Sequence, residues 1–352
     1  MTTPVSRRAV IGGLTALGPA TALAQSQAGP QFGKTPTVFK PPYPVIGKVT
    51  RASSALDALI DADARVEQVV DGFVRVEGPC WVGGADGYLL CSDTRGNAII
   101  KWSPRDGRSV WKSPSGFDNG VFWDPMLAEP GTNAMILARG GILCADCGNR
   151  TLSFFDLKTR KKSILVSAFE GKRLNNPNDL VLAPDGSVYF NDPPFAFADR
   201  GDHNPTRQLD FGGIFRLSPD NKVTLVDSTP LSNGIALSPD GKTLYSTDPP
   251  SGWLAWDLDA NGVASNKRVF IDRSTGIMGG DGMKVDTTGH LWGATREALV
   301  IWDPKGTRIG SIAIDGEAPS NCEFGADGYL YITFVTKVAR VKVKARKIAR
   351  KV

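Results

Sequence analysis

Oxygen-bearing residues recur in one frame, eight residues before a turn glycine, at distant points of the sequence. The frame runs from Asn178 to Gly186, from Asn233 to Gly241, and from Asp281 to Gly289. An earlier hairpin places Glu77 before a turn with two extra residues, and a later one repeats the spacing from Ser320. Asparagine and aspartate are poor strand formers, so packing alone would not favour them at strand starts. The repetition therefore predicts a site built from equivalent strand starts.

The chemistry of these residues indicates a cation. Glu77, Asn178, Asn233 and Asp281 form an all-oxygen set with two carboxylates and two neutral amides. Hard oxygen ligands of this kind suit Ca²⁺, and Mg²⁺, Mn²⁺, Fe²⁺ and Zn²⁺ remain open. The alternative is that the four residues cap strand ends and bond to backbone amides. That alternative requires four coincidences, so we expect a metal site.

The elements that must position these residues are short strands joined by turns. In the stretch 171–197, Leu180–Leu182 and Val188–Phe190 predict two strands around the turn Pro184–Gly186. Comparable strand pairs fill six units, at Val74–Trp102, Ser109–Leu157, Leu174–Leu217, Val223–Leu258, Lys267–Asp303 and Arg308–Val343. Their period matches the four-stranded blade of a propeller, and strands alternating with helices are absent. We predict an all-β, six-bladed β-propeller over residues 54–352, with a central metal channel.

The N-terminus has the pattern of an export signal. Arg7 and Arg8 form a twin-arginine pair, followed by an apolar run to Leu17 and by the small-x-small site Ala22–Ala24. We therefore assign residues 1–24 to a removed twin-arginine signal and expect a periplasmic protein, with no membrane span after cleavage. Residues 25–53 contain five prolines and predict an extended linker or strap.

The net charge of +5 is concentrated at the two ends. Removing Arg7, Arg8 and the eight basic residues between Lys337 and Lys351 leaves about −5 on residues 25–336. A mildly acidic body suits a cation site. The basic tail alternates apolar and charged residues, which predicts a strand with one wet face. It lacks interleaved aromatics, so we expect no nucleic-acid partner. We expect a monomer or small homo-oligomer.

Other catalytic designs have weak support. Cys144 and Cys147 form a CxxC, but there is no second such pair, and zinc would need two more ligands. Buried thiols are the favoured interpretation of the five cysteines, and a disulfide between Cys80 and Cys91 on one hairpin stays open. There is no Gly-x-Ser-x-Gly elbow.

Several motifs resemble the senescence-marker-protein (regucalcin)/gluconolactonase family, especially its bacterial gluconolactonases. They are Val76-Glu77-Gly78-Pro79, Leu90-Cys91-Ser92-Asp93 and GKRLNNPNDLVLAPDGSVYFNDPP from Gly171. The resemblance covers nearly all of residues 55–343 and implies a six-bladed propeller with one catalytic divalent cation. It implies Glu77, Asn178, Asn233 and Asp281 as metal ligands and Asp281 as general base or nucleophile. It also implies that Asp179 contacts substrate or a ligand, and that the sugar side of the pocket is lined by Asn176, Asn119 and Asp192.

The sequence departs from the family at the pocket wall. The family's Cys-Glu-His-Gly is replaced by Ala145-Asp146-Cys147-Gly148, and its Tyr-Gly after the double proline by Phe195-Ala196. These changes spare the proposed ligands. We predict a metal-dependent hydrolase that opens a sugar lactone or a similar small lactone, with the cation polarising the carbonyl. The alternatives are an organophosphate or phosphofluoridate hydrolase on the same site, and a non-catalytic propeller that binds a protein partner.

Overall fold

The structure, a computed structural model, describes residues 35–117, 128–197, 203–277 and 279–350. This part of the chain is almost entirely antiparallel β-structure, with two short 3₁₀ helices, η1 (Ser54–Ala58) and η2 (Arg273–Thr275). Among the described residues, no helix has the length and apolarity needed to cross a bilayer. The all-β prediction is confirmed. The predicted signal, residues 1–24, lies outside the described residues.

Four sheets contain four strands each, and in every one the strand order follows the sequence. The first holds β3 (Val76–Val82), β4 (Tyr88–Asp93), β5 (Ala98–Ser103) and β6 (Gly107–Lys112). The second holds β7 (Thr132–Ala138), β8 (Gly141–Asp146), β9 (Thr151–Phe155) and β10 (Lys162–Val166). The third holds β13 (Leu180–Leu182), β14 (Val188–Asn191), β15 (Ile214–Leu217) and β16 (Val223–Asp227). The fourth holds β17 (Ile235–Leu237), β18 (Thr243–Asp248), β19 (Gly252–Leu258) and β20 (Ala264–Ile271).

A nine-stranded sheet completes the ring, in the order β21-β22-β23-β24-β1-β2-β27-β26-β25. One end holds β21 (Met283–Val285), β22 (Leu291–Ala294), β23 (Leu299–Trp302) and β24 (Arg308–Ile314). The other end holds β25 (Pro319–Phe324), β26 (Tyr329–Phe334) and β27 (Lys337–Lys342). Two strands from the N-terminal part, β1 (Val45–Arg51) and β2 (Val66–Asp71), join the two ends. A short hairpin, β11 (Ala168–Phe169) and β12 (Lys172–Arg173), stands apart.

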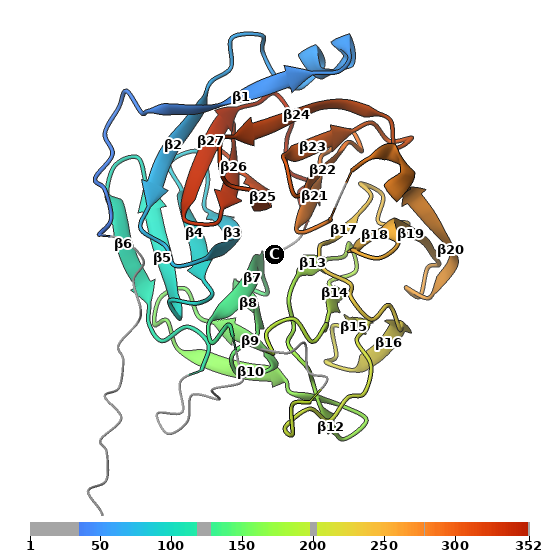
Figure 1. The fold of residues 1–352 in the computed structure, drawn as a ribbon. Helices are drawn as coiled ribbons and strands as arrows, with labels where there is room; N and C mark the ends of the chain where they lie inside the picture. Colours follow the sequence, from blue (N-terminus) through green and yellow to red (C-terminus); the bar gives the residue numbers. More distant parts are fainter. Residues whose placement is uncertain (1–34, 118–127, 198–202, 278, 351–352) are drawn as a thin grey trace, which may run out of the picture.

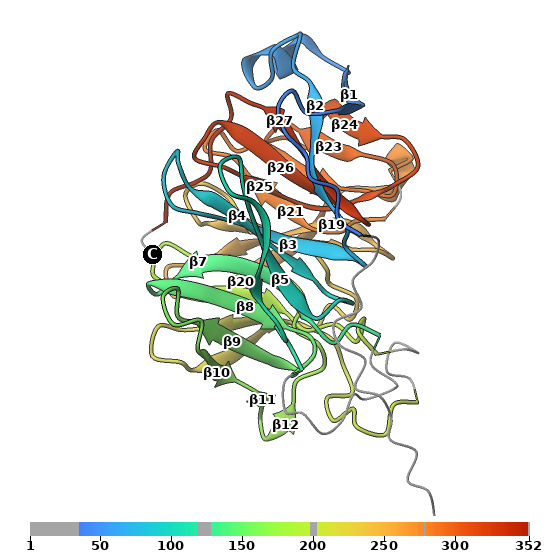
Figure 2. The ribbon, with the colours of Figure 1, turned by 90° about the vertical axis from the view of Figure 1, so that its left-hand side faces the viewer.

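The sheets are arranged around a common centre, with β3, β7, β13, β17, β21 and β25 innermost (Figure 1). Figure 2 shows β1 at the periphery, so the segment predicted as a strap supplies a strand of the outer wall. The core consists of apolar layers between neighbouring sheets, for example Leu143 and Leu152 with Phe190 and Phe215. Each inner strand is therefore largely buried between the layers on its two faces.

The predicted borders between units are wrong at several points. New units are predicted to begin at Ser109, Val223, Lys267 and Arg308. The strands at these positions instead pair with the strand that precedes each of them in the sequence, as β6, β16, β20 and β24 show. Of these strands, β6, β16 and β20 are more exposed than the inner ones and resemble isolated half-buried strands in the sequence. Strand β24 is mostly buried, because β1 pairs with its other edge. The C-terminal strand prediction is confirmed, with Val341 buried and Lys342 exposed in β27.

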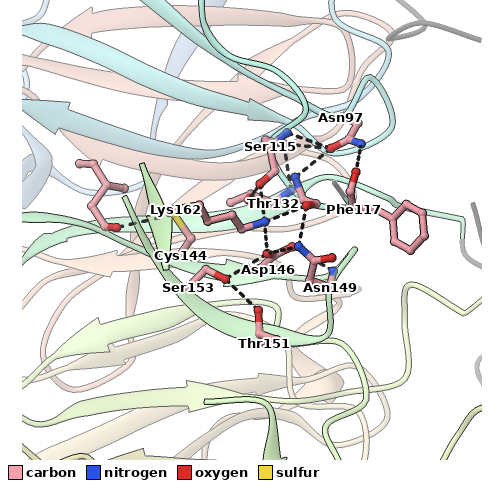
Figure 3. A network of polar contacts seen from close by, with 12 residues as sticks. Asn97, Ser115, Phe117, Thr132, Cys144, Asp146, Asn149, Thr151, Ser153 and Lys162 are labelled. Carbon is pink, nitrogen blue, oxygen red and sulfur yellow. Dashed lines mark hydrogen bonds and ion pairs between the residues drawn. The ribbon is translucent and has the colours of Figure 1, made fainter. Parts of the chain in front are cut away.

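A buried polar network joins the first and second sheets (Figure 3). Lys162 Nζ lies 2.6 Å from Asp146 Oδ2, and these side chains are 8% and 0% exposed. The same ammonium donates to the carbonyl oxygens of Ser115 and Gly116 at 2.9 and 2.7 Å. Asp146 also accepts a hydrogen bond from the backbone nitrogen of Asn149 at 3.1 Å. Because a buried charge needs a partner, the network fixes the loop after β6 against β8 and β10.

The C-terminal residues 344–350 connect sheets that lie apart in the sequence. Arg350 Nη2 donates to the carbonyl oxygen of Ser238 at 2.9 Å, in the turn between β17 and β18. Lys347 Nζ lies 3.0 Å from Glu323 Oε1 in β25, and the Glu323 side chain is 1% exposed. The tail therefore supplies the positive charge that a buried carboxylate requires.

All five cysteines are buried and free, as the buried-thiol interpretation predicts. The disulfide between Cys80 and Cys91 is not formed. Cys80 is paired in register with Leu90, so the next residue, Cys91, projects from the opposite face of the sheet. The two thiols accordingly lie in different apolar clusters.

Candidate active site

The four predicted ligand residues lie along one cavity of ≈ 350 Å³ near the centre of the ring. Glu77, Asn178, Asn233 and Asp281 all contribute to its lining. A larger hollow of ≈ 860 Å³ lies between the outer strands β10 and β16, and its lining includes one carboxylate, Glu170. Volume alone therefore does not identify the site. The grouping of carboxylates and amides makes the smaller cavity the candidate site.

Equivalent backbone hydrogen bonds position three of these residues. In each case the residue just before an inner strand donates its N–H to the carbonyl at the end of the neighbouring strand. These bonds run from Asn178 to Asn191 at 3.1 Å, from Asn233 to Thr247 at 3.0 Å and from Asp281 to Ala294 at 3.0 Å. Glu77 lies one residue inside β3, in register with Ser92. The repeated sequence frame thus corresponds to a repeated backbone geometry.

Glycine follows three of the four proposed ligand residues, Glu77, Asn233 and Asp281, and allows neighbouring inner strands to approach closely. A Cβ on Gly234 would lie 2.1 Å from the carbonyl oxygen of Asp281. A Cβ on Gly78 would lie 2.1 Å from the carbonyl oxygen of Asn133, and Gly78 also has a φ of 51°. Only glycine avoids both the clash and the strain. The Glu-Gly, Asn-Gly and Asp-Gly pairs of the sequence are therefore requirements of packing around the axis.

A chain of amides orients the neutral side chains of the site. Asn133 Nδ2 donates to Asn178 Oδ1 at 2.8 Å, and Asn178 Nδ2 donates to Asn233 Oδ1 at 3.2 Å. The three residues come from the second, third and fourth sheets in turn, so the chain follows the inner edge of the ring. Each bond restricts the rotamer of an amide that lines the cavity.

An arginine lies among the carboxylates of the cavity. Arg75 Nη2 is 3.4 Å from Glu77 Oε1 and 4.0 Å from Asp281 Oδ2. Arg75 Nε is 3.3 Å from Oε1 of Glu129, which belongs to the segment before β7. The exposed fractions are 5% for Glu77, 15% for Glu129 and 29% for both Asp281 and Arg75. A single guanidinium thus contacts three carboxylates in a small volume.

The carboxylates have raised pKa values because they are buried, and the nearby arginines offset this only in part. Burial, with the charge of Asp281, raises the pKa of Glu77 well above its usual value, and Arg75 only partly opposes this. Burial also raises the pKa of Asp281 to about 6, against the opposing effect of Arg75. The pKa of Glu129 is raised by burial as well. A further cation would stabilise all three ionised forms.

The other predicted site residues have different positions. Asp179 is 2% exposed and accepts a hydrogen bond from the backbone N–H of Leu180 at 2.8 Å. Asp192 is 0% exposed and accepts from the backbone N–H of Asn175 at 2.7 Å. Neither residue, nor the buried Asn176, is among the described residues that line the cavity. Asn119 lies outside the described residues. The structure gives Asp192 a part in the hydrogen bonding of the chain itself.

Sequence reasoning missed Arg75, Glu129 and Asn133, all of which line the cavity. Two had a signal. Arg75 precedes Glu77 by two residues, and side chains at that spacing in extended chain share a face. Asn133 stands eight residues before Gly141, the same frame that identified Asn178. Glu129 comes from a connecting segment without a motif, so nothing in the sequence marked it.

A ring of antiparallel sheets around one cavity lined by carboxylates and amides is the architecture of a propeller-type protein. The comparisons with known proteins agree with this class. Residues 76–336 match the family described as the SMP-30/Gluconolactonase/LRE-like region. The chain belongs to this family, and the resemblance seen in its motifs is confirmed.

Several relatives carry lactonase names. A gluconolactonase of Zymomonas mobilis is 34% identical over 95% of this chain and 94% of its own length. An L-arabinolactonase of Azospirillum brasilense is 29% identical over 70% of this chain and 79% of its own. Among solved structures, a gluconolactonase of Xanthomonas campestris has a TM-score of 0.71 and 28% identity, over 85% of this chain and 97% of that one.

The departures from the family pattern lie beside the cavity. Cys147, in place of the family's histidine, is buried and donates from Sγ to the carbonyl oxygen of Pro177 at 3.0 Å. It packs with Ala196 and Phe197. Phe195, in place of the family's tyrosine, lines the cavity. Of these two residues, only Phe195 is among the described residues that line the cavity.

Proposed function

We propose that this lactonase opens the ester ring of a sugar lactone or a similar small lactone, using one divalent cation held by Glu77, Asn178, Asn233 and Asp281. The observation that carries the proposal is the convergence of four residues, far apart in the sequence, on one cavity. The names of the relatives, gluconolactonase and L-arabinolactonase, support the substrate class. The proposed ion is Ca²⁺, because the donors are hard oxygens of mixed charge.

We further propose that the ring has six blades of four strands. Four blades are the four-stranded sheets. The nine-stranded sheet can be divided into β21 to β24, and β25 to β27 with β2, with β1 bridging the two outer strands. This count gives every blade one innermost strand, which is the arrangement expected of a closed propeller.

The residues present fit a cation. Among the described residues, no three His, Cys, Asp or Glu side chains group as metal ligands. The proposed set instead uses two carboxylates with two amide oxygens, which suits Ca²⁺ better than zinc or copper. The guanidinium of Arg75, within 4.0 Å of both carboxylates, serves as a stand-in positive charge at the same location. The side-chain carbonyl oxygens of Asn178 and Asn233 would complete the set.

The reaction divides between the ion and the chain. When bound, a divalent cation would polarise the lactone carbonyl and stabilise its developing negative charge. Asp281, whose pKa of about 6 leaves it ionised at neutral pH, would take a proton from the attacking water or attack the carbonyl itself. The amide chain from Asn133 would hold Asn178 and Asn233 in place. Asp179 would act through its charge on Asp281 rather than by touching substrate.

The test combines metal analysis with a substrate panel. Protein stripped with a chelator should lose lactone hydrolysis, and one equivalent of Ca²⁺ per chain should restore it. Gluconolactone and other aldonolactones should be hydrolysed faster than a phosphofluoridate ester analogue. Full activity in the stripped protein would contradict the metal requirement. A preference for the phosphofluoridate would favour the organophosphatase alternative, and no turnover with tight binding of a protein would favour the non-catalytic one.

The predicted location and domain organisation remain proposals. We propose that residues 1–24 are removed on twin-arginine export and that the protein works in the periplasm. N-terminal sequencing of the protein recovered from the periplasmic fraction tests this. A first residue before Gln25, or recovery in the cytoplasm only, would contradict it.

A further inference from the structure

Among the described residues, Arg75 makes longer ion pairs than most of the other paired arginines. Its three contacts, to Glu77, Glu129 and Asp281, are 3.4, 3.3 and 4.0 Å long. Structural pairs elsewhere in the chain are shorter, for example 2.8 Å from Arg216 to Asp185. Charge-assisted hydrogen bonds are typically about 2.7–2.9 Å long. Arg75 is therefore held in the cavity by the summed charge of three carboxylates rather than by one close, directional bond.

Two of the three carboxylates are the charged members of the proposed ligand set. The third, Glu129, lies outside that set and is also approached by Arg95 at 3.9 Å. A guanidinium and a divalent cation cannot both occupy the space between Glu77 and Asp281 without strong repulsion, because both are positive and the space is largely shielded from water. Glu129 provides an alternative partner for Arg75, because Arg75 Nε already lies 3.3 Å from Glu129 Oε1.

We propose that Arg75 competes with the divalent cation for Glu77 and Asp281 and so lowers the affinity of the site, moving to Glu129 when the cation binds. This inference rests on the proposed function, because it takes Glu77 and Asp281 as ligands. It assigns Arg75 a positioning role: in the absence of metal it keeps two like charges together, which would otherwise repel one another. With metal bound, the same guanidinium neutralises Glu129 beside the substrate.

Titration calorimetry on the full chain tests the competition, with CaCl₂ as the probe and chelator-treated protein in the cell. Removing the charge in Arg75→Gln should tighten Ca²⁺ binding at least about tenfold, equivalent to about 1.4 kcal/mol. Arg75→Met should behave in the same way, whereas Arg75→Lys, which keeps the charge, should stay near wild type. Arg95→Gln is the matched control. Arg95 is 53% exposed, and of the three carboxylates it lies near Glu129 only. Its affinity should change less than about twofold.

Thermal denaturation provides a second readout that does not depend on turnover. Without metal, Arg75→Gln should melt below wild type because Glu77 and Asp281 lose their positive neighbour. Added Ca²⁺ should then raise its melting temperature more than it raises that of wild type. Unchanged or weaker Ca²⁺ binding in both neutral variants, with wild type binding normally, would overturn the role of Arg75 and leave the metal site intact. Failure of wild type and every variant to bind Ca²⁺ would overturn the proposed function and this inference together.

Discussion

Replacing Asp281 with asparagine should abolish most activity and, without metal at neutral pH, stabilise the fold. Asparagine keeps the shape of the side chain and one carbonyl oxygen, but it cannot accept the proton of the attacking water. Proton transfer by a positioned group contributes about 10²–10⁴-fold, so kcat on a lactone should fall by about that factor. Binding of Ca²⁺ should also weaken, because one of the two negative charges is lost.

The gain in stability follows from the pKa of Asp281. Its pKa is raised from 3.8 to about 6, chiefly by burial. At about 1.36 kcal/mol per pKa unit, the ionised carboxylate destabilises the folded state by up to about 3 kcal/mol. The side chain is 29% exposed, so solvent screening reduces this to about 1–2 kcal/mol. A carboxyl group whose pKa is raised in the folded state destabilises the fold at pH values above that pKa. At pH values below its pKa in the unfolded state, it has no such effect. The gain should therefore be present at about pH 8 and absent at about pH 3.5.

The assay is thermal denaturation in chelator at both pH values, beside lactone hydrolysis with Ca²⁺ present. The control is Asp210→Asn, because that carboxylate is 83% exposed. It should change neither stability nor turnover. The reasoning is refuted if Asp281→Asn melts below wild type at about pH 8 without metal, or if it keeps full turnover on lactones with Ca²⁺ bound.

Three further predictions concern the cation and two lysines that each pair with a buried carboxylate. Ca²⁺ affinity, measured by calorimetry, should fall by up to about tenfold per pH unit below about pH 6, as protons bind Asp281; a flat profile would contradict this. Lys162→Met should lower the free energy of unfolding by about 3–5 kcal/mol in urea denaturation, whereas Arg105→Gln, an exposed pair, should leave it unchanged. Lys347→Met should lower it by about 1–3 kcal/mol by leaving Glu323 buried without its cation. Lys344→Met is the control, because Lys344 pairs with the exposed Asp61. Equal effects of the two substitutions would refute this explanation.

The sequence predicted the all-β class and the repeated frame because both depend on local patterns. Strand alternation and turn glycines are local, and Gly186 and Gly241 have the positive φ that such turns need. The grouping of strands was not local. An outermost strand such as β16 looks the same in the sequence whether it pairs with the strand before or after it, and only three-dimensional packing decides.

The candidate site likewise has features that local sequence patterns predict and features that only three-dimensional packing decides. The eight-residue spacing before a turn glycine identified Asn178, Asn233 and Asp281, because equivalent strands repeat equivalent backbone positions. It did not show that an arginine would lie among them, because the position of a long side chain depends on its neighbours in space. For Asp192, the place beside the family motif predicts substrate binding. The structure shows one oxygen of its carboxylate accepting a hydrogen bond from the backbone N–H of Asn175, and contact with a substrate stays a prediction.

The pairing of β2 with β27 has a consequence for how the protein is made. Glu67 Oε2 accepts a hydrogen bond from Arg340 Nε across a separation of 273 residues, so β2 and β27 can pair only after residue 340 has been synthesised. Until then, the edge of β2 that pairs with β27 has no partner strand. Contacts of such long separation are slow to form. An unpaired edge during synthesis is open to wrong pairing, so the closing of the ring is the step at which misfolding is expected.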